Sequence, residues 1–144
     1  MAGELAGKVA LVTGGVRRIG RATALALAAE GAAVVINARS SLDEAKDAAA
    51  EVAKLGVRSK AILADVTSEE PVKAMMAEII RDFGRLDILI NNAGIRKDAA
   101  FTEMALADWR AVMAVVLDGA FLCSRAAIPH MIKAGGGTII NIGG

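Results

Sequence analysis

Residues 8–20 read KVALVTGGVRRIG, and this stretch decides the fold class. It starts with a short β-rich run over residues 8–13, passes through the turn Gly14-Gly15, and enters a helical pattern over residues 19–30. Glycines let such a turn tighten and let backbone amides approach a pyrophosphate, while the start of the helix offers free N–H groups to the anion. A tight turn alone would explain the glycines, but their place between a first strand and a first helix favours dinucleotide binding.

Beyond the turn, strand-length apolar runs alternate with helix-length segments. Further strands are predicted at residues 33–37, 58–64, 86–91 and 138–142, and helices at residues 42–55, about 67–84 and 106–133. Thr67 or Ser68 is expected to cap the helix that follows the third strand. This alternation predicts an α/β fold, a doubly wound parallel sheet with helices on both faces. The strands are apolar without interruption, which is typical of strands covered on both faces.

Length, composition and charge exclude several classes of protein. A chain of 144 residues predicts one domain, and 17 Lys+Arg against 16 Asp+Glu predict no nucleic-acid partner. The longest apolar-rich stretch, residues 111–131, is interrupted by Asp118 and Arg125, so no membrane span is predicted. The single cysteine, Cys123, excludes an internal disulfide, and the first residues carry no secretory signal. We therefore expect a cytoplasmic protein.

The end of the second strand indicates which cofactor would bind. In folds of this kind that take NAD, an acid about 20 residues past the glycines holds the ribose hydroxyls. Residues 36–41 read INARSS and contain no acid. A guanidinium binds a 2′-phosphate through two N–H groups, whereas a carboxylate repels it. Arg39, with Arg17 from the glycine turn and Ser40, therefore favours NADP(H) over NAD(H), although either arginine alone could be a solvated loop charge.

Three motifs in order make the chain resemble a known family. The turn is similar to the TGxxxGxG signature of short-chain dehydrogenases/reductases, Asp65-Val66 follows the third strand, and residues 91–94 read NNAG after the fourth. The resemblance covers the whole chain and implies a Rossmann-type sheet of five strands in the order 3-2-1-4-5. Because the family fold has seven strands, residues 1–144 would be the dinucleotide-binding domain of a longer protein, truncated on its C-terminal side. One departure is Arg18, which stands where the family has its middle glycine.

The resemblance also implies a set of cofactor-binding residues. Asp65 and Val66 match the pair that contacts the adenine, and the NNAG motif shapes the centre of the sheet beside the cofactor. The implied set is Gly14, Arg17, Arg18, Ile19, Gly20, Arg39, Ser40, Asp65, Val66, Asn91, Ala93 and Gly94. No metal site is predicted. The long helix 106–133 resembles the one through which family members form homodimers and homotetramers.

The positions that would carry the chemistry depart from the family. Its members use an Asn in the long helix, a Ser after the fifth strand, and a Tyr and a Lys in the next helix, for general acid–base catalysis beside a hydride-carrying cofactor. Here Val116 stands at the Asn position and Gly144 at the Ser position, and the sequence contains no Tyr. No catalytic residue is therefore identified, and the 144-residue chain alone is expected to be inactive.

Two interpretations stay open. One is an NADP(H)-dependent oxidoreductase of this family, which interconverts a small-molecule carbonyl and alcohol and is represented here by its N-terminal portion. The other is a non-catalytic NADP(H)-binding protein that acts as a sensor or as a structural partner. The cofactor motifs fit both, whereas Val116 and Gly144 favour the second.

Overall fold

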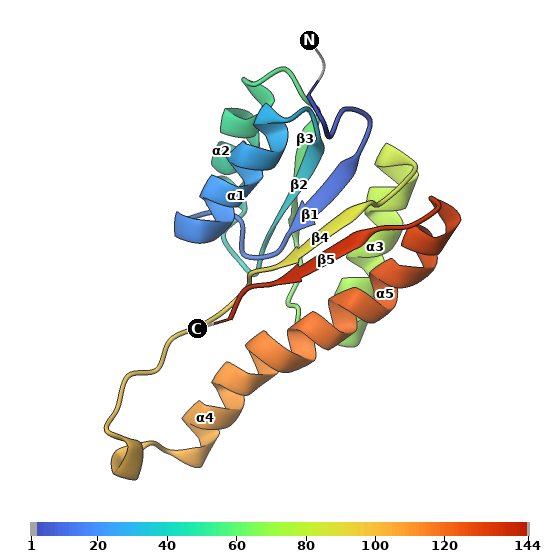
Figure 1. Ribbon diagram of the computed structural model, residues 1–144. Helices are drawn as coiled ribbons and strands as arrows, with labels where there is room; N and C mark the ends of the chain where they lie inside the picture. Colours follow the sequence, from blue (N-terminus) through green and yellow to red (C-terminus); the bar gives the residue numbers. More distant parts are fainter. Residues whose placement is uncertain (1–2, 144) are drawn as a thin grey trace.

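Five parallel strands form one sheet in the computed structural model, which describes residues 3–143 (Figure 1). The sheet order is β3-β2-β1-β4-β5, so the predicted fold class and strand order are confirmed. The strands are β1 (Val9–Val12), β2 (Ala33–Ala38), β3 (Ser59–Leu63), β4 (Ile88–Asn91) and β5 (Thr138–Asn141). The helices are α1 (Arg18–Ala29), α2 (Leu42–Ala53), α3 (Glu69–Phe83), α4 (Leu106–Met113) and α5 (Gly119–Lys133), with a 3₁₀ turn at Phe101–Glu103.

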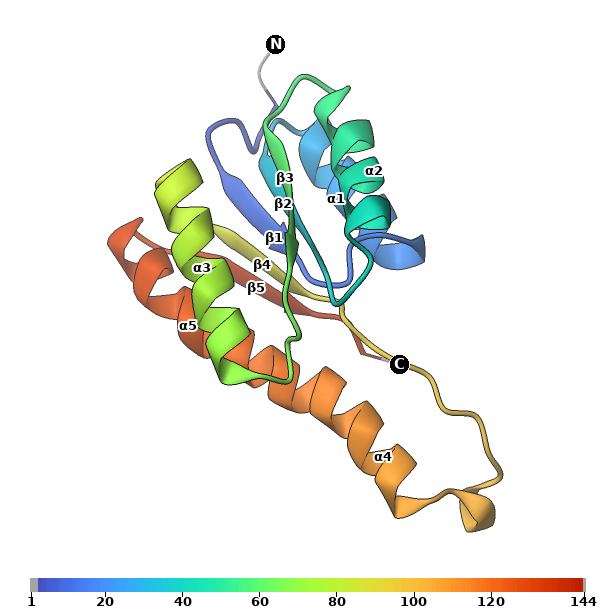
Figure 2. The same cartoon turned by 180° about the vertical axis from the view of Figure 1, so that it is seen from behind.

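Each central strand is covered on both faces, because successive side chains point to opposite sides of a sheet. On β1, Val9 and Leu11 belong to the apolar cluster that contains residues of α3 and α5. Ala10 and Val12 belong to the cluster that contains residues of α1 and α2. All four are at most 5% exposed, which explains why the strand is apolar without a break. Figures 1 and 2 show the two helix layers on opposite faces of the sheet.

The long helix differs from the sequence prediction in its middle. The segment expected over residues 106–133 is helical, but a π turn, Ala114–Asp118, separates α4 from α5. A π turn takes one extra residue per turn and recurs at functional sites. Val116, which stands at the family's Asn position, lies at the centre of this turn.

The same helix has the length and composition of a membrane span. Leu106–Lys133 reaches a mean hydropathy of 1.8, and only 17% of its most apolar window is buried. One such helix is weak evidence for a span, because the core helix of a non-membrane protein passes the same test. Here α5 contacts β4 and α3. Asp118 and Arg125 do not disqualify the segment by composition, and the absence of a span stays a prediction.

The side-chain cap predicted for α3 is wrong. Ser68 is the residue that precedes the helix, but among the described residues its side chain makes no capping hydrogen bond. Thr67 turns back to Asp65 instead, donating its N–H (2.9 Å) and its hydroxyl (2.7 Å) to Oδ1. Thr67 therefore orients the carboxylate of Asp65, which follows β3. The start of α3 carries Glu69 and Glu70 in its first turn, and their negative charges interact favourably with the helix dipole.

A buried carboxylate joins β1 to β4 at the end of the sheet opposite the glycine turn. Asp87 is 4% exposed, and its Oδ2 accepts the N–H of Val9 (2.9 Å). Arg85 donates to both oxygens, from Nε (2.8 Å) and Nη2 (2.7 Å), and Lys8 Nζ lies 3.9 Å from Oδ1. Burial pushes the pKa of Asp87 up, but the hydrogen bonds from Arg85 and Val9 and the nearby positive charges outweigh it and hold this pKa below its ordinary value.

We predict that Asp87→Asn lowers the free energy of unfolding at neutral pH by about 1–3 kcal/mol, because the amide loses the charge-assisted bonds. The folded-state pKa of Asp87 lies below the unfolded value of about 3.9, so the carboxylate stabilises the fold fully above that pH. This contribution is lost as the pH falls through the folded-state pKa. Urea unfolding at a series of pH values should show the two proteins converging below about pH 4.

Asp98→Asn is the matched control, because Asp98 is an exposed carboxylate paired with the exposed Arg96. We expect this control to change the free energy of unfolding by less than about 0.5 kcal/mol at any pH. Equal effects of the two variants, or a loss in Asp87→Asn that does not depend on pH, would contradict the assignment.

Candidate functional site

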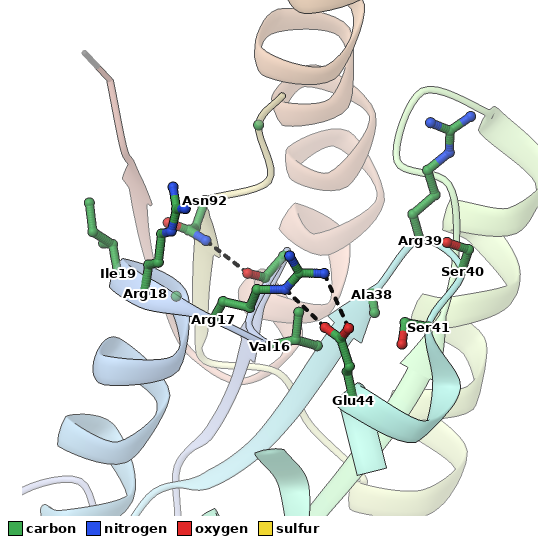
Figure 3. Close-up of a pocket in the computed structure, with 13 residues that line it drawn as sticks. Val16, Arg17, Arg18, Ile19, Ala38, Arg39, Ser40, Ser41, Glu44 and Asn92 are labelled. Atoms are coloured by element: carbon green, nitrogen blue, oxygen red, sulfur yellow. Dashed lines mark hydrogen bonds and ion pairs between the residues drawn. The ribbon is translucent and has the colours of Figure 1, made fainter. Parts of the chain in front are cut away.

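A cavity of about 520 Å³ opens at the carboxyl ends of β1, β2 and β4. β1 pairs with β2 on one side and with β4 on the other. The chain adds β2 and β3 on the first side and then crosses to add β4 and β5 on the second, so the strand order reverses at β1. Ligands of open α/β sheets bind in the crevice at such a point. Figure 3 shows its lining, which comes from the glycine turn, the start of α2 and the loops after β2 and β4: Gly14, Val16, Arg17, Arg18, Ile19, Gly20, Ala38, Arg39, Ser40, Ser41, Glu44, Asn92 and Gly94.

The glycine turn is tied to the loop after β4 by a two-way set of hydrogen bonds. Thr13 Oγ1 accepts the N–H groups of Asn92 and Ala93, each at 3.0 Å. Asn92 Nδ2 donates in return to the carbonyl oxygens of Thr13 and Gly14, each at 3.1 Å. The two walls of the cavity are therefore held at a fixed separation before any ligand arrives.

This close approach explains why glycine is needed at two positions of the turn. A Cβ on Gly20 would lie 2.4 Å from Asn92 Nδ2 and 2.6 Å from the Gly14 carbonyl oxygen, where no side chain fits. Gly14 has φ +61, and a Cβ there would lie 3.0 Å from Ala93 Cα. Both glycines thus let the backbone of the turn reach the loop after β4.

Arg18 occupies the position where the sequence departs from the family signature, and its backbone adopts a conformation that favours glycine. Its φ is +50, which makes it the one non-glycine residue with positive φ among residues 3–143. An L-residue in this left-handed region costs roughly 1–2 kcal/mol relative to the right-handed region. The chain therefore carries backbone strain at the mouth of the cavity and places a guanidinium there.

Asn37 is a residue of the site that the sequence analysis missed. It is 2% exposed at the end of β2, and its Oδ1 accepts the Gly14 N–H at 3.3 Å. Its Nδ2 donates to the carbonyl oxygens of Ile62 (3.3 Å) and Ala64 (3.1 Å). This amide joins the glycine turn to β3, and the signal that could have found it is a lone polar side chain in an otherwise apolar strand.

The two arginines expected to bind a 2′-phosphate each face a carboxylate. Arg17 meets Glu44 at two points, Nε to Oε2 at 2.9 Å and Nη2 to Oε1 at 3.3 Å. Arg39 Nε lies 3.7 Å from Asp65 Oδ2. The hydrogen bonds from Thr67, and more weakly the charge of Arg39, hold the pKa of Asp65 below its ordinary value, so this carboxyl is charged at neutral pH.

A second, smaller cavity of about 110 Å³ adjoins the first and shares Gly14, Arg39 and Gly94 with it. Three further residues of the predicted set line it, namely Asp65, Val66 and Ala93. Within residues 3–143, the exception in the predicted set is Asn91, which lines neither cavity. Its buried Nδ2 donates to Ser124 Oγ (3.1 Å) and Asn141 Oδ1 (2.9 Å), so it joins β4 to β5 and α5.

Of the two positions at which the family has its catalytic Asn and Ser, the structure describes one, Val116. Val116 is in the π turn and lines neither of the two cavities, although its neighbour Val115 lines the smaller one. Gly144 lies outside the described residues. Among residues 3–143, no cluster of His, Cys, Asp or Glu could hold a metal ion.

Comparison with known proteins finds matches over nearly the whole chain. Residues 8–144 match the family described as short chain dehydrogenase. A 3-oxoacyl-(acyl-carrier-protein) reductase of Synechocystis sp. is 44% identical over 138 residues, which cover 96% of this chain and 56% of the relative. The 3-oxoacyl-(acyl-carrier-protein) reductase FabG of Staphylococcus aureus is 43% identical over 135 residues, which cover 94% of this chain and 55% of that relative.

A solved structure shows the same arrangement of elements. The crystal structure of an NAD⁺-bound xylitol dehydrogenase superposes with a TM-score of 0.90 at 37% sequence identity. The match covers 94% of this chain and 52% of the other. The chain thus spans about half the length of the relatives that it matches.

The strained backbone of Arg18 gives a prediction about stability. We expect Arg18→Gly to be more stable than Arg18→Ala by about 1 kcal/mol, because both variants lose the guanidinium and the alanine alone keeps a Cβ at positive φ. Urea unfolding of the two variants measures the difference.

Arg110 provides the control, since it lies inside α4 with ordinary helical neighbours. There the order should invert, with Arg110→Gly less stable than Arg110→Ala by about 1 kcal/mol. The same order at both positions would show that residue 18 does not hold the left-handed conformation in solution.

Proposed function

This chain belongs to the short-chain dehydrogenase family, and from that premise we propose that it is the cofactor-binding domain of an NADP(H)-preferring oxidoreductase. The reaction proposed is the interconversion of a small-molecule carbonyl compound and an alcohol. The observation that carries the proposal is the cavity at the point where the strand order reverses. Three arginines line this cavity, and the residues at the end of β2 include no acid.

The residues of the two cavities fit a phosphorylated dinucleotide. The N–H groups at the start of α1 and the glycine turn would hold the pyrophosphate, where the helix dipole favours an anion. Arg39 and Ser40 would bind the 2′-phosphate, with Arg17 on the facing wall of the same cavity. Asp65 and Val66, in the adjoining cavity, would contact the adenine. The nicotinamide of the bound cofactor would supply or accept the hydride.

The preference for NADP(H) rests on this chain's own residues. The xylitol dehydrogenase that it resembles was solved with NAD⁺, so family membership leaves both cofactors open. Residues 36–41 offer two hydroxyls and a guanidinium where an NAD-binding relative has a carboxylate. A phosphate finds hydrogen-bond donors there, whereas the free hydroxyls of NAD(H) find no carboxylate acceptor on that loop.

The reductases of Synechocystis sp. and Staphylococcus aureus suggest the substrate class. Both are reductases of 3-oxoacyl groups, so a 3-oxoacyl thioester is the compound to test first. We also propose that the protein forms a homodimer or homotetramer through the face of α4 and α5, where large apolar side chains are exposed: Trp109 (50%), Leu117 (55%), Phe121 (58%) and Ile128 (43%).

A second function, NADP(H) binding without catalysis, is favoured by one observation. Val116 replaces the family's Asn with a side chain that cannot hydrogen-bond, in a π turn next to the smaller cavity. Oxidation of NADPH by a 3-oxoacyl thioester, assayed with the protein as its source makes it, distinguishes the two functions. Turnover supports the oxidoreductase, whereas binding of NADPH without turnover supports the second function.

We predict that Arg39→Asp reverses the cofactor preference. The variant exchanges a donor pair for a charge that repels the 2′-phosphate, so its Kd for NADPH should rise about 10- to 100-fold. The Kd for NADH should fall or stay unchanged, because a carboxylate can accept the ribose hydroxyls. Calorimetric titration with each cofactor measures both values.

Lys54→Asp makes the same change of charge at the far end of α2, away from the cavity. This control should leave the Kd for each cofactor within about twofold, since exposed charges beyond a Debye length are largely screened. An unchanged Kd for NADPH in Arg39→Asp would overturn the assignment of the 2′-phosphate site.

A further inference from the structure

Glu44 is the one acidic residue in the lining of the larger cavity, which otherwise gathers arginines. It lies in the first turn of α2 and faces the glycine turn, as Figure 3 shows. Its carboxylate binds Arg17 through two contacts, Nε to Oε2 at 2.9 Å and Nη2 to Oε1 at 3.3 Å. The Arg17 and Glu44 side chains are 68% and 46% exposed, so solvent and ligand can reach the pair.

A carboxylate and a phosphate compete for the same face of a guanidinium. Both bind it through two parallel N–H groups, and one occupant of that fork excludes the other. A 2′-phosphate that binds the Nε–Nη2 edge of Arg17 must therefore displace Glu44, and one that binds the Nη1–Nη2 edge still lies near its negative charge. NADH has an uncharged hydroxyl in place of the phosphate, so its binding neither displaces Glu44 nor brings a negative charge close to it. The acid thus acts against one cofactor and leaves the other almost untouched.

We propose that Glu44 is a specificity-determining residue, which holds Arg17 in the free protein, weakens the binding of NADPH and so narrows the preference for NADPH over NADH. This inference rests on the proposed function. Glu44, the acid that weakens the preference for NADPH, comes from the first turn of α2. The end of β2, residues 36–41, contains no acid. Arg39 is not held by Glu44, because its side chain points away from that acid (Figure 3); its own neighbour is Asp65, whose Oδ2 lies 3.7 Å from Arg39 Nε.

The simpler explanation is that Glu44 stabilises α2, since an acid in the first turn suits the helix dipole. Asp43 separates the two explanations. It lies in the same turn and carries the same charge, but it does not line the larger cavity and forms no ion pair within residues 3–143. Asp43→Asn therefore reproduces the change in helix electrostatics without touching the pair with Arg17.

The experiment is calorimetric titration of NADPH and NADH into wild type, Glu44→Gln, Asp43→Asn, Arg17→Gln and the double variant of Glu44 and Arg17. Loss of an exposed ion pair and of one repulsive charge predicts that Glu44→Gln binds NADPH about three- to tenfold more tightly. NADH should change by less than about twofold, as should both cofactors with Asp43→Asn. In the Arg17→Gln background the gain from Glu44→Gln should be smaller, since the pair no longer exists and only the repulsion of the phosphate by Glu44 is removed.

Each other outcome overturns the inference. An equal gain in Asp43→Asn would show a general charge effect, and an undiminished gain in the double variant would show that Arg17 is not involved. Wild-type protein that binds NADPH but does not respond to Glu44→Gln refutes the inference and leaves the proposed function standing. Folded wild-type protein that binds neither cofactor refutes the proposed function, and the inference with it; circular dichroism establishes that each variant is folded.

Discussion

The hydrogen bonds between Thr13 and Asn92 are the constraint on which the site depends. They join the turn after β1 to the loop after β4, so the backbones approach until Gly20 has no room for a Cβ. The left-handed backbone at Gly14 belongs to the same close approach. The cavity and its three arginines lie beside this junction, and its geometry is set by hydrogen bonds between these two side chains and the backbone.

Electrostatics act on this framework in two opposed ways. The cavity carries more positive than negative charge, as an anionic cofactor requires. Yet Arg17 and Arg39 are each paired with a carboxylate, so part of that charge is neutralised in the free protein. Arg18 adds a guanidinium at a position whose backbone favours glycine. Affinity for the cofactor therefore depends on how readily exposed ion pairs exchange partners, which costs little because such pairs are weak.

Sequence reasoning was sufficient where a local pattern determines the structure. Uninterrupted apolar strands that alternate with helical segments predicted the parallel sheet, and the family resemblance implied its strand order. The residues that this resemblance implied for the cofactor border the two cavities, apart from Asn91. Sequence reasoning failed where the partner comes from another element. The sequence predicts that Thr67 or Ser68 caps α3, but Ser68 makes no capping hydrogen bond and Thr67 bonds to Asp65 instead. The amide of Asn37 finds its partners on β3 and the turn, through contacts that no spacing in one strand reveals. The π turn was also missed, because hydrophobic periodicity does not distinguish it from the helix around it.

The central claim is that this chain binds a nicotinamide dinucleotide at the carboxyl ends of β1, β2 and β4. Titration of isotope-labelled chain with NADPH, followed by amide chemical shifts, tests it most directly. We expect the perturbed amides to map to residues 14–20, 38–41, 65–66 and 92–94, which border the two cavities. Shifts centred on residues 134–138, at the opposite end of the sheet, or no shifts at all, would contradict the account.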